Sequence, residues 1–314
     1  MKRVFFNNQD NKNISQRKTV AAVQEHPMAN NDPQSWLVDL IKAFVNNSPE
    51  NSLRMEIEEK AWDEPLVGFS SGADHLYESY KETVGEDHWT PREAFLLKFP
   101  LSEVKPADLT VISWVLPHRA STKVDNGKEN FYPSRRWVQA RFPGEEFNNS
   151  LRKHVVRELE KKGVPAVAPL LLPEWSWGKS SQYVYSSKWS ERHAAYASGL
   201  GTFGLCDGLI TPKGKAHRVG SAVARLVVPA TARPYTDHHA YCLFYFNGSC
   251  SACRKRCPVG AITAAGHDKV KCWDHAAGTC GRYVQEIYNF AGYGCGLCQT
   301  AVPCESEIPR IILR

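Results

Sequence analysis

The sequence predicts an α/β (α+β) chain that carries a cysteine-rich, metal-binding segment near its C-terminus. Two apolar runs of strand length, at 109–116 and 164–172, flank a helical pattern at 148–161. Strand, helix and strand in this order favour a sheet covered by helices. Nine of the ten cysteines then fall between residues 242 and 304, which predicts a second part that binds metal.

The composition is that of a globular protein with room for two domains. Of the 314 residues, 42% are hydrophobic and 23% are charged. The net charge of +6 is mild, and its basic residues are spread along the chain without a polybasic block. Nucleic acid is therefore not expected as a partner, whereas a weakly positive pocket for an anionic cofactor would fit.

The sequence predicts a cytoplasmic location. The first residues contain neither an apolar run of signal-peptide length nor a twin-arginine pair, and no 18 consecutive residues are apolar. Cysteines clustered at metal-ligand spacing are typical of a reducing compartment and not of a disulfide scaffold. No membrane partner is expected.

Residues 1–31 are polar and predict a flexible arm. Asp32 is placed to cap a helix that has Pro33 at its first position, and the helix has an apolar face of Trp36, Leu37, Leu40, Ile41 and Phe44. The stretches at 62–69 and 121–129 read as loops. Between them, Thr90 and Glu93 have the spacing of a capping box.

The second half continues the sheet. Asn148, Asn149 or Ser150 is expected to cap the helix that ends near Gly163. A helix at 190–197, with Ser190 as its cap, precedes a glycine-rich stretch, and strands are expected at 207–212 and 218–228. A linker at 229–239 then leads into the cysteines.

The cysteine spacing predicts two 4Fe-4S clusters. Cys250, Cys253 and Cys257 form a Cys-x2-Cys-x3-Cys-Pro run that is close to the bacterial ferredoxin pattern, and Cys242 is placed to replace its missing first cysteine. The alternative is a zinc site, which paired cysteines also suit. Two sets of ligands are predicted, Cys242, Cys250, Cys253 and Cys304 for one cluster and Cys257, Cys272, Cys295 and Cys298 for the other. Cys280 is the alternative to Cys272, and Cys206 is interpreted as a small buried residue.

The glycine stretch has the form Gly-x-Gly-x-x-Gly, but it follows a helix and precedes a strand. A dinucleotide fingerprint requires the reverse order. The glycines are therefore interpreted as points of close approach for a large flat ligand. The predicted cofactor-binding residues are Gly199, Leu200, Gly201, Thr202, Phe203, Gly204, Ile210, Thr211 and Arg218.

Taken together, these motifs resemble those of the cobalamin-dependent reductive dehalogenases and the related epoxyqueuosine reductases. The likeness covers roughly residues 60–305 and rests on 190–204, on 209–216 and on the double cysteine motif. It implies a nitroreductase-like domain at 32–235 that holds a base-off corrinoid, followed by a ferredoxin-like domain at 236–314. Two departures stand out. The chain lacks a twin-arginine leader, and five residues separate Cys298 from Cys304.

The resemblance also implies a proton donor. In epoxyqueuosine reductases an Asp precedes a Leu-Arg helix, and Glu146 stands at the matching position. The alternative is that Glu145 and Glu146 are solvated acids at a helix entry. Dehalogenases use a Tyr supported by a cation, for which the candidates are Tyr132, Tyr183 and Tyr185 with Lys188, Arg192 or Arg218.

Three functions remain open from the sequence. The first is a corrinoid and iron–sulfur reductase that removes halide from, or reductively cleaves, a small organic substrate, with an electron donor such as ferredoxin or flavodoxin. The second is an electron-transfer protein that binds no substrate. The third is an epoxyqueuosine reductase-like enzyme that modifies tRNA.

Overall fold

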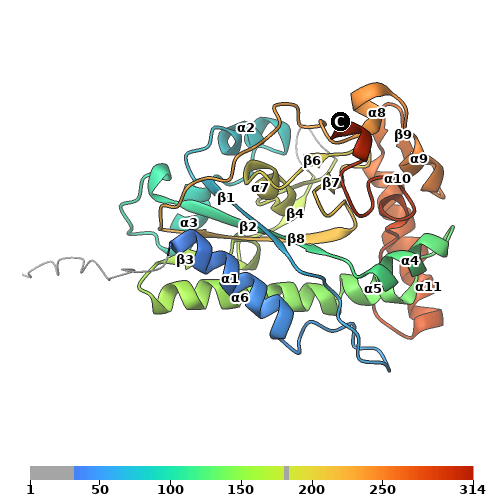
Figure 1. The fold of residues 1–314 in the computed structure, drawn as a ribbon, viewed down its shortest axis with the longest axis horizontal. Coiled ribbons are helices and arrows are strands. Elements are labelled where there is room, and N and C mark those ends of the chain that lie inside the picture. The colour runs from blue at the N-terminus through green and yellow to red at the C-terminus, as the bar shows by residue number, and fades with distance from the viewer. Residues whose placement is uncertain (1–31, 180–183, 314) are drawn as a thin grey trace, which may run out of the picture.

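The computed structural model describes residues 32–179 and 184–313, and its centre is a four-stranded sheet (Figure 1). The strand order is β1 (Leu66–Ser71), β2 (Thr110–Pro117), β8 (His217–Ala224) and β3 (Ala166–Val167). Every neighbouring pair is antiparallel, and Ser113 at the middle of β2 faces Ser221 of β8. The mixed α/β class is confirmed.

Helices cover both faces of this sheet (Figure 1). Helices α1 (Pro33–Asn47) and α6 (Pro143–Lys161) pack on one face, against Ile112 and Trp114. Helices α2 (Leu76–Thr83), α3 (Pro91–Lys98) and α7 (Glu191–Ala197) pack on the other face, against Val111 and Val115. Successive side chains of a strand point to opposite faces, so β2, which is buried along its whole length, contributes to two cores.

Local signals placed three helix ends correctly, the starts of α1 and α3 and the end of α6. The Asp32 carboxylate accepts hydrogen bonds from the amides of Gln34 and Ser35 at the start of α1. Thr90 and Glu93 form a capping box at the start of α3. Gly163, which follows α6, has a φ of +74°, as a helix-ending glycine requires.

Four expectations about elements were wrong. Strand β1 overlaps the stretch at 62–69 that was expected to be a loop, and helix α4 (Ala120–Lys128) replaces the loop expected at 121–129. Helix α6 begins at Pro143, before the expected caps. The strand expected at 164–172 is reduced to β3, because Pro169 cannot donate to a ladder and begins a 3-10 turn.

The remaining elements are short. Helix α5 (Arg135–Arg141) precedes α6, β4 (Trp177–Gly178) pairs with β5 (Ser186–Ser187), and β6 (Thr202–Phe203) pairs with β7 (Leu209–Ile210). The cysteine segment contains α8 (Leu243–Asn247), α9 (Ala252–Arg256), β9 (Ile262–Thr263), β10 (Gly266–His267), α10 (Lys269–Trp273), a π-helical turn (Asp274–Thr279) and α11 (Cys280–Tyr288). Further 3-10 turns are Pro106–Asp108, Pro169–Leu171, Leu297–Gln299 and Arg310–Ile312.

The cysteine segment lies at one end of the sheet, beside α4 and α5 (Figure 1). The Arg256 guanidinium donates to the backbone carbonyls of Asn126, Glu129, Leu297 and Thr300. Gly214 has a φ of +76°, and a Cβ there would lie 2.1 Å from the Glu305 carbonyl oxygen. The chain near its C-terminus is therefore fastened to the turn that precedes β8. Across the described helices, none combines the length and apolar character that a membrane span requires.

Candidate metal centre and adjoining cavities

The four cysteines of the first predicted set line one cavity. Cys242 precedes α8, Cys253 lies on α9 with Cys250 just before it, and Cys304 comes from the C-terminal tail. Helix α9 is only five residues long, and Cys257, which directly follows it, lines the cavity of the second set. The structure thus brings this set together, while its role as a ligand set stays a prediction.

The second predicted set lines a neighbouring cavity of about 240 Å³. Cys257 follows α9, Cys272 lies on α10, and Cys295 and Cys298 flank a tight turn at Gly296. Gly296 has a φ of +68°, and a Cβ there would lie 1.9 Å from the Trp137 ring. Only glycine allows this turn to press against α5.

Cys280 and His275 form a further group beside the second set. One ligand atom each of His275, Cys280 and Cys295 lies within 4.8 Å of the others. The Cys280 sulfur lies 3.4 Å from His275 Nε2, and both side chains are buried. Cys272, in contrast to Cys280, lines the 240 Å³ cavity of the second set. The choice between Cys272 and Cys280 therefore stays open.

Cys206 joins the two sets, although it comes from the turn before β7. Its sulfur contacts the sulfurs of Cys253 and Cys298, one from each set. These contacts, together with the Lys215 ammonium, outweigh burial and hold the pKa of Cys206 well below its ordinary value. Lys215 Nζ lies 3.3 Å from the Cys206 sulfur, and the lysine is 2% exposed.

A buried lysine needs negative charge nearby. Burial lowers the pKa of Lys215, but the sulfurs of Cys206, Cys304 and Cys298 raise it well above the ordinary value. Soft sulfur donors of this kind suit iron–sulfur clusters and zinc. The donor set therefore fits a metal centre with thiolate ligands.

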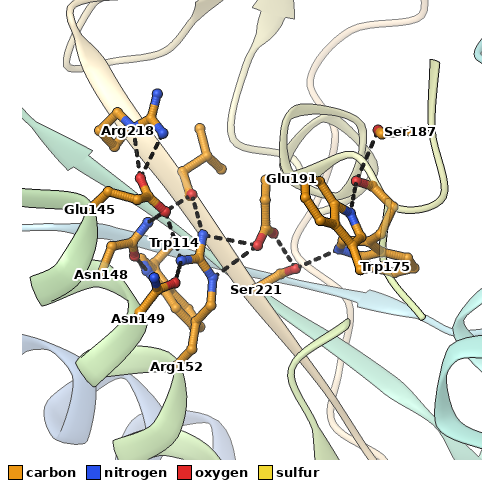
Figure 2. Close-up of polar contacts among 12 residues, drawn as sticks. Trp114, Glu145, Asn148, Asn149, Arg152, Trp175, Ser187, Glu191, Arg218 and Ser221 are labelled. Atoms are coloured by element: carbon orange, nitrogen blue, oxygen red, sulfur yellow. Dashed lines mark hydrogen bonds and ion pairs between the residues drawn. The ribbon is translucent and has the colours of Figure 1, made fainter. Parts of the chain in front are cut away.

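On the sheet side, a chain of charged groups lines a third cavity of about 380 Å³ (Figure 2). The Arg152 guanidinium is fully buried and binds Glu145 at 2.8 Å and Glu191 at 3.0 Å. Glu145 also binds Arg218 at 2.7 Å. The hydroxyl of Ser221 donates to Glu191, which fixes the far end of the network.

The two carboxylates of this network have opposite pKa shifts. Burial raises the pKa of Glu145, but the positive charges of Arg218 and Arg152 outweigh it, so the net pKa is lowered. Burial raises the pKa of Glu191, and here the attraction of Arg152 does not overcome it. A carboxylate with a lowered pKa and one with a raised pKa therefore share Arg152.

The predicted catalytic residues that the structure describes do not all share one cavity, although Tyr185 and Arg192 do. The Glu146 side chain is 62% exposed and pairs with Arg54, and it lines none of these three cavities. Tyr132 stacks on Tyr283 with ring centroids 3.9 Å apart, and Lys188 donates to the Glu174 carbonyl. Tyr185 packs edge-on against Trp177, and both line a further cavity of about 330 Å³ together with Arg192. Tyr183 lies outside the described residues.

Two of the predicted basic residues do reach the cavities. Arg192 and Arg218 both line the 240 Å³ and the 380 Å³ cavities. Arg192 donates to the Asp207 carbonyl, and Arg218 binds Glu145.

Most of the glycine stretch packs against its own chain. A Cβ at Gly199 would lie 2.7 Å from the Ala232 carbonyl, and one at Gly201 would lie 2.2 Å from the Ile210 carbonyl. Gly204 and Ile210 line the small cavity of the first cysteine set. Leu200, Thr202, Phe203 and Thr211, like Gly199 and Gly201, line none of the three cavities. At Gly199 and Gly201 the close approach is therefore one of backbone to backbone, while cofactor binding by this stretch stays a prediction.

Sequence reasoning missed Glu145, Arg152 and Glu191 as site residues. A helical signal was available, because Glu145, Asn148 and Arg152 recur at intervals of three and four residues and so share one face. Glu146 is about 100° away from that face. No pattern linked Glu191 to them, since it comes from a separate helix.

No family model and no curated protein matches the chain. Among solved structures, an epoxyqueuosine reductase from Bacillus subtilis matches at 16% identity over 87% of this chain, with a TM-score of 0.47. An epoxyqueuosine reductase with a modified tRNA stem loop matches at 15% identity over 89% of this chain, and 70% of that chain is covered, with a TM-score of 0.47. A catabolic reductive dehalogenase matches at 14% identity over 79% of this chain, with a TM-score of 0.43.

The chain spans 65% of the length of the Bacillus subtilis enzyme and 31% of the length of the dehalogenase. These three solved structures are of the same two kinds of enzyme that the sequence resembles.

Proposed function

We propose that the chain is a cytoplasmic iron–sulfur and corrinoid-dependent reductase that dehalogenates, or otherwise reductively cleaves, a small organic substrate. One observation carries this proposal. The cavity lined by the second cysteine set is also lined by Arg192 and Arg218 from the sheet side, so electron donors and charged groups meet at one place. A plain electron carrier has no need of such a charged cavity.

The residues present fit the proposed groups. Two sets of four cysteines line two neighbouring cavities, as two clusters require. The 240 Å³ and 380 Å³ cavities share Arg141, Arg192, His217, Arg218 and Gln299, which leaves adjoining space for a larger cofactor. In this proposal 32–235 is the nitroreductase-like domain and 236–314 the ferredoxin-like domain. The clusters would supply single electrons, and a base-off corrinoid would supply a strongly reducing metal.

The overall reaction takes two electrons and one proton, replaces a carbon–halogen bond with a carbon–hydrogen bond, and releases halide. The chain's own residues serve the proton and the anion. Glu191, with its raised pKa, is suited to hold the proton, and Glu145, with its lowered pKa, keeps Arg152 and Arg218 in place. The guanidinium of Arg192 lies on the cavity wall, where it favours a departing anion.

Anaerobic reconstitution tests this function. We expect about eight irons and one cobalt per chain. Iron without cobalt uptake would leave only the electron carrier, and zinc in place of iron would exclude both functions. Halogenated organic compounds and an epoxyqueuosine-containing tRNA stem loop, offered separately, would then distinguish dehalogenation from tRNA modification.

The role of Glu191 is tested on the same preparation. Glu191→Gln should slow turnover and remove the limb of the pH–rate profile that depends on this acid. The iron and cobalt contents should stay unchanged. Glu146→Gln is the matched control and should leave turnover unchanged. If the two variants behave alike, Glu191 is not the proton donor.

A further inference from the structure

The first cysteine set lies apart from the charged cavities. Among the described residues, its cavity shares no lining residue with the 240 Å³ cavity and only Lys215 with the 380 Å³ cavity. The second set, by contrast, lines the 240 Å³ cavity together with Arg192 and Arg218. In the proposed reductase, electrons therefore enter at the first set and leave through the second.

Helix α8 lies between the first set and solvent. Its residues Leu243 and Phe244 line the cavity of this set, as does Cys253 of α9. The next two residues of α8, Tyr245 and Phe246, are 42% and 56% exposed. Exposed aromatic rings at adjacent positions are typical of a surface that contacts another protein.

The exposed rings belong to a continuous stretch of surface. All residues from 245 to 249, which join α8 to Cys250, are exposed. Helices α8 and α9 line the same small cavity and lie on the side of the cysteine segment that faces away from the sheet (Figure 1). A partner can therefore approach the first set here without meeting the sheet or its helices.

The chain around this set is basic. No residue between Asp237 and Asp268 is acidic, whereas Arg254 and Lys255 lie on α9. Both side chains are exposed, and neither forms an ion pair with a described residue. The buried Lys215 ammonium offsets part of the negative charge that a thiolate-bound cluster would carry. The exposed positive charges are therefore free to attract a partner.

The acids of the C-terminal tail do not cancel this charge. Glu305 and Glu307 follow Cys304. Glu307 pairs with Arg310 at 3.1 Å, and Glu305 accepts a hydrogen bond from the Ala301 amide. One carboxylate without a basic partner therefore faces three basic residues of α9, and the surroundings of the first set stay net positive.

We propose that the outer side of α8 and the exposed side of α9 dock a small acidic electron-carrier protein, such as a ferredoxin or a flavodoxin. Tyr245 and Phe246 supply apolar contact, and Arg254 and Lys255 attract carboxylates of the carrier. One electron passes from the reduced carrier to the oxidised first cluster, so the carrier is oxidised and the cluster is reduced. The inference rests on the proposed function and names its partner.

Contacts between redox proteins are small and weak, so charge acts mainly on the rate of association. The oxidised, anaerobically reconstituted protein is mixed with a reduced acidic ferredoxin or, separately, a reduced acidic flavodoxin, and cluster absorbance is followed by stopped flow. The second-order rate constant of the parent should fall as salt is added. The double variant Arg254→Glu/Lys255→Glu should lower it at least roughly tenfold at low salt.

Two further variants sharpen the measurement. Lys153→Glu/Arg157→Glu makes the same change of charge at exposed positions of α6 and should keep the parent rate. Phe246→Ala should slow reduction and keep the salt dependence of the parent, because it removes apolar contact and no charge.

Reduction by dithionite, which is too small to need a docking surface, is the second control and should be similar in all these proteins. Slower reduction of the α9 double variant by dithionite as well as by the carriers would overturn the proposal, because the two residues would then act on the cluster itself. An unchanged rate with both carriers would overturn it too. A parent dimer that dissociates in Phe246→Ala, seen by analytical ultracentrifugation, would assign this surface to a second copy of the chain.

The measurement follows reduction of the clusters and not turnover of a substrate. Iron uptake without cobalt would overturn the proposed reductase function and leave the docking site testable in the same way. Failure of docking in protein with full iron and cobalt content would overturn this inference alone.

Discussion

At the scale of single residues, His88 makes stability depend on pH. The side chain is 1% exposed, and its Nε2 accepts a hydrogen bond from the Ser190 amide at 3.2 Å. Burial lowers the pKa of His88 to about 4. The unfolded chain has a histidine pKa of about 6.5, so it binds a proton first as the pH falls. The stability contributed by neutral His88 is therefore present above pH 6.5 and is lost between about pH 6.5 and 4.

His88→Gln should remove this loss of stability at acid pH, which amounts to about 3 kcal/mol in the free energy of unfolding. The measurement is the free energy of unfolding by urea at several pH values between 7 and 4. His75→Gln, at a side chain that is 83% exposed, is the control and should keep the parent slope. Parallel pH profiles for the parent and His88→Gln would show that His88 is not the group responsible.

Lys215 makes a second prediction at this scale, within the proposed two-cluster protein. Its ammonium lies among the sulfurs of Cys206, Cys253, Cys298 and Cys304. A positive charge favours the reduced, more negative form of a cluster, so Lys215→Met should lower the reduction potential. The reduction potential is measured by redox titration that is followed by electron paramagnetic resonance.

Two matched variants sharpen the Lys215 test. Lys215→Arg should retain most of the potential, and Lys213→Met, which changes the less buried lysine of the same turn, should retain all of it. A potential that is the same in all four proteins would assign Lys215 a packing role only.

At the scale of elements, α6 joins the sheet to the charged network through Arg152. Arg152→Met leaves Glu145 and Glu191 without their shared cation in a buried site. Breaking a buried ion pair in this way typically costs about 3–5 kcal/mol. Urea unfolding measures the loss. Arg157→Met on the same helix is exposed and should change stability by less than about 0.5 kcal/mol, and similar losses in both variants would refute this role of Arg152.

The elements that could be predicted from sequence carry their signal locally. Helix α1 has its cap and proline at adjacent positions, and β2 is an uninterrupted apolar run. Helix α4 could not be predicted, because its polar residues are satisfied by distant groups. The Asn126 side chain, for example, donates a hydrogen bond to the Thr300 hydroxyl and accepts one from the Ser134 amide. Strand β1 is ordered by its antiparallel pairing with β2, about 45 residues later in the chain.

The candidate site divides in the same way. Cysteine spacing predicted two ligand sets, and each set lines one cavity. This was possible because the spacing of metal ligands is visible in short stretches of sequence. Cys206 could not be found this way, since only the folded chain brings it to Cys253 and Cys298. Motif position favoured Glu146 over Glu145. Adjacent residues of a helix point in different directions, and the Glu146 side chain is exposed to solvent.

At the scale of the whole molecule, Arg256 holds the cysteine segment against α4. Its guanidinium reaches the Asn126 and Glu129 carbonyls on one side and the Leu297 and Thr300 carbonyls on the other. Arg256→Met should loosen this docking before global unfolding occurs. Protein without bound metal should then react faster with a thiol reagent, and Arg254→Met, at an exposed site on the same helix, should react as the parent does. Equal rates for the two variants would contradict this role.

The fastening of the turn before β8 to the chain near its C-terminus has a consequence for biosynthesis. The amides of Lys215 and Ala216 both donate to the Glu305 carbonyl, about 90 residues further along the chain. During translation the sheet strands emerge long before that partner does. In the proposed two-cluster protein, the surroundings of Lys215 cannot be completed before residue 305 has left the ribosome, so metal insertion is expected to be a late, post-translational event.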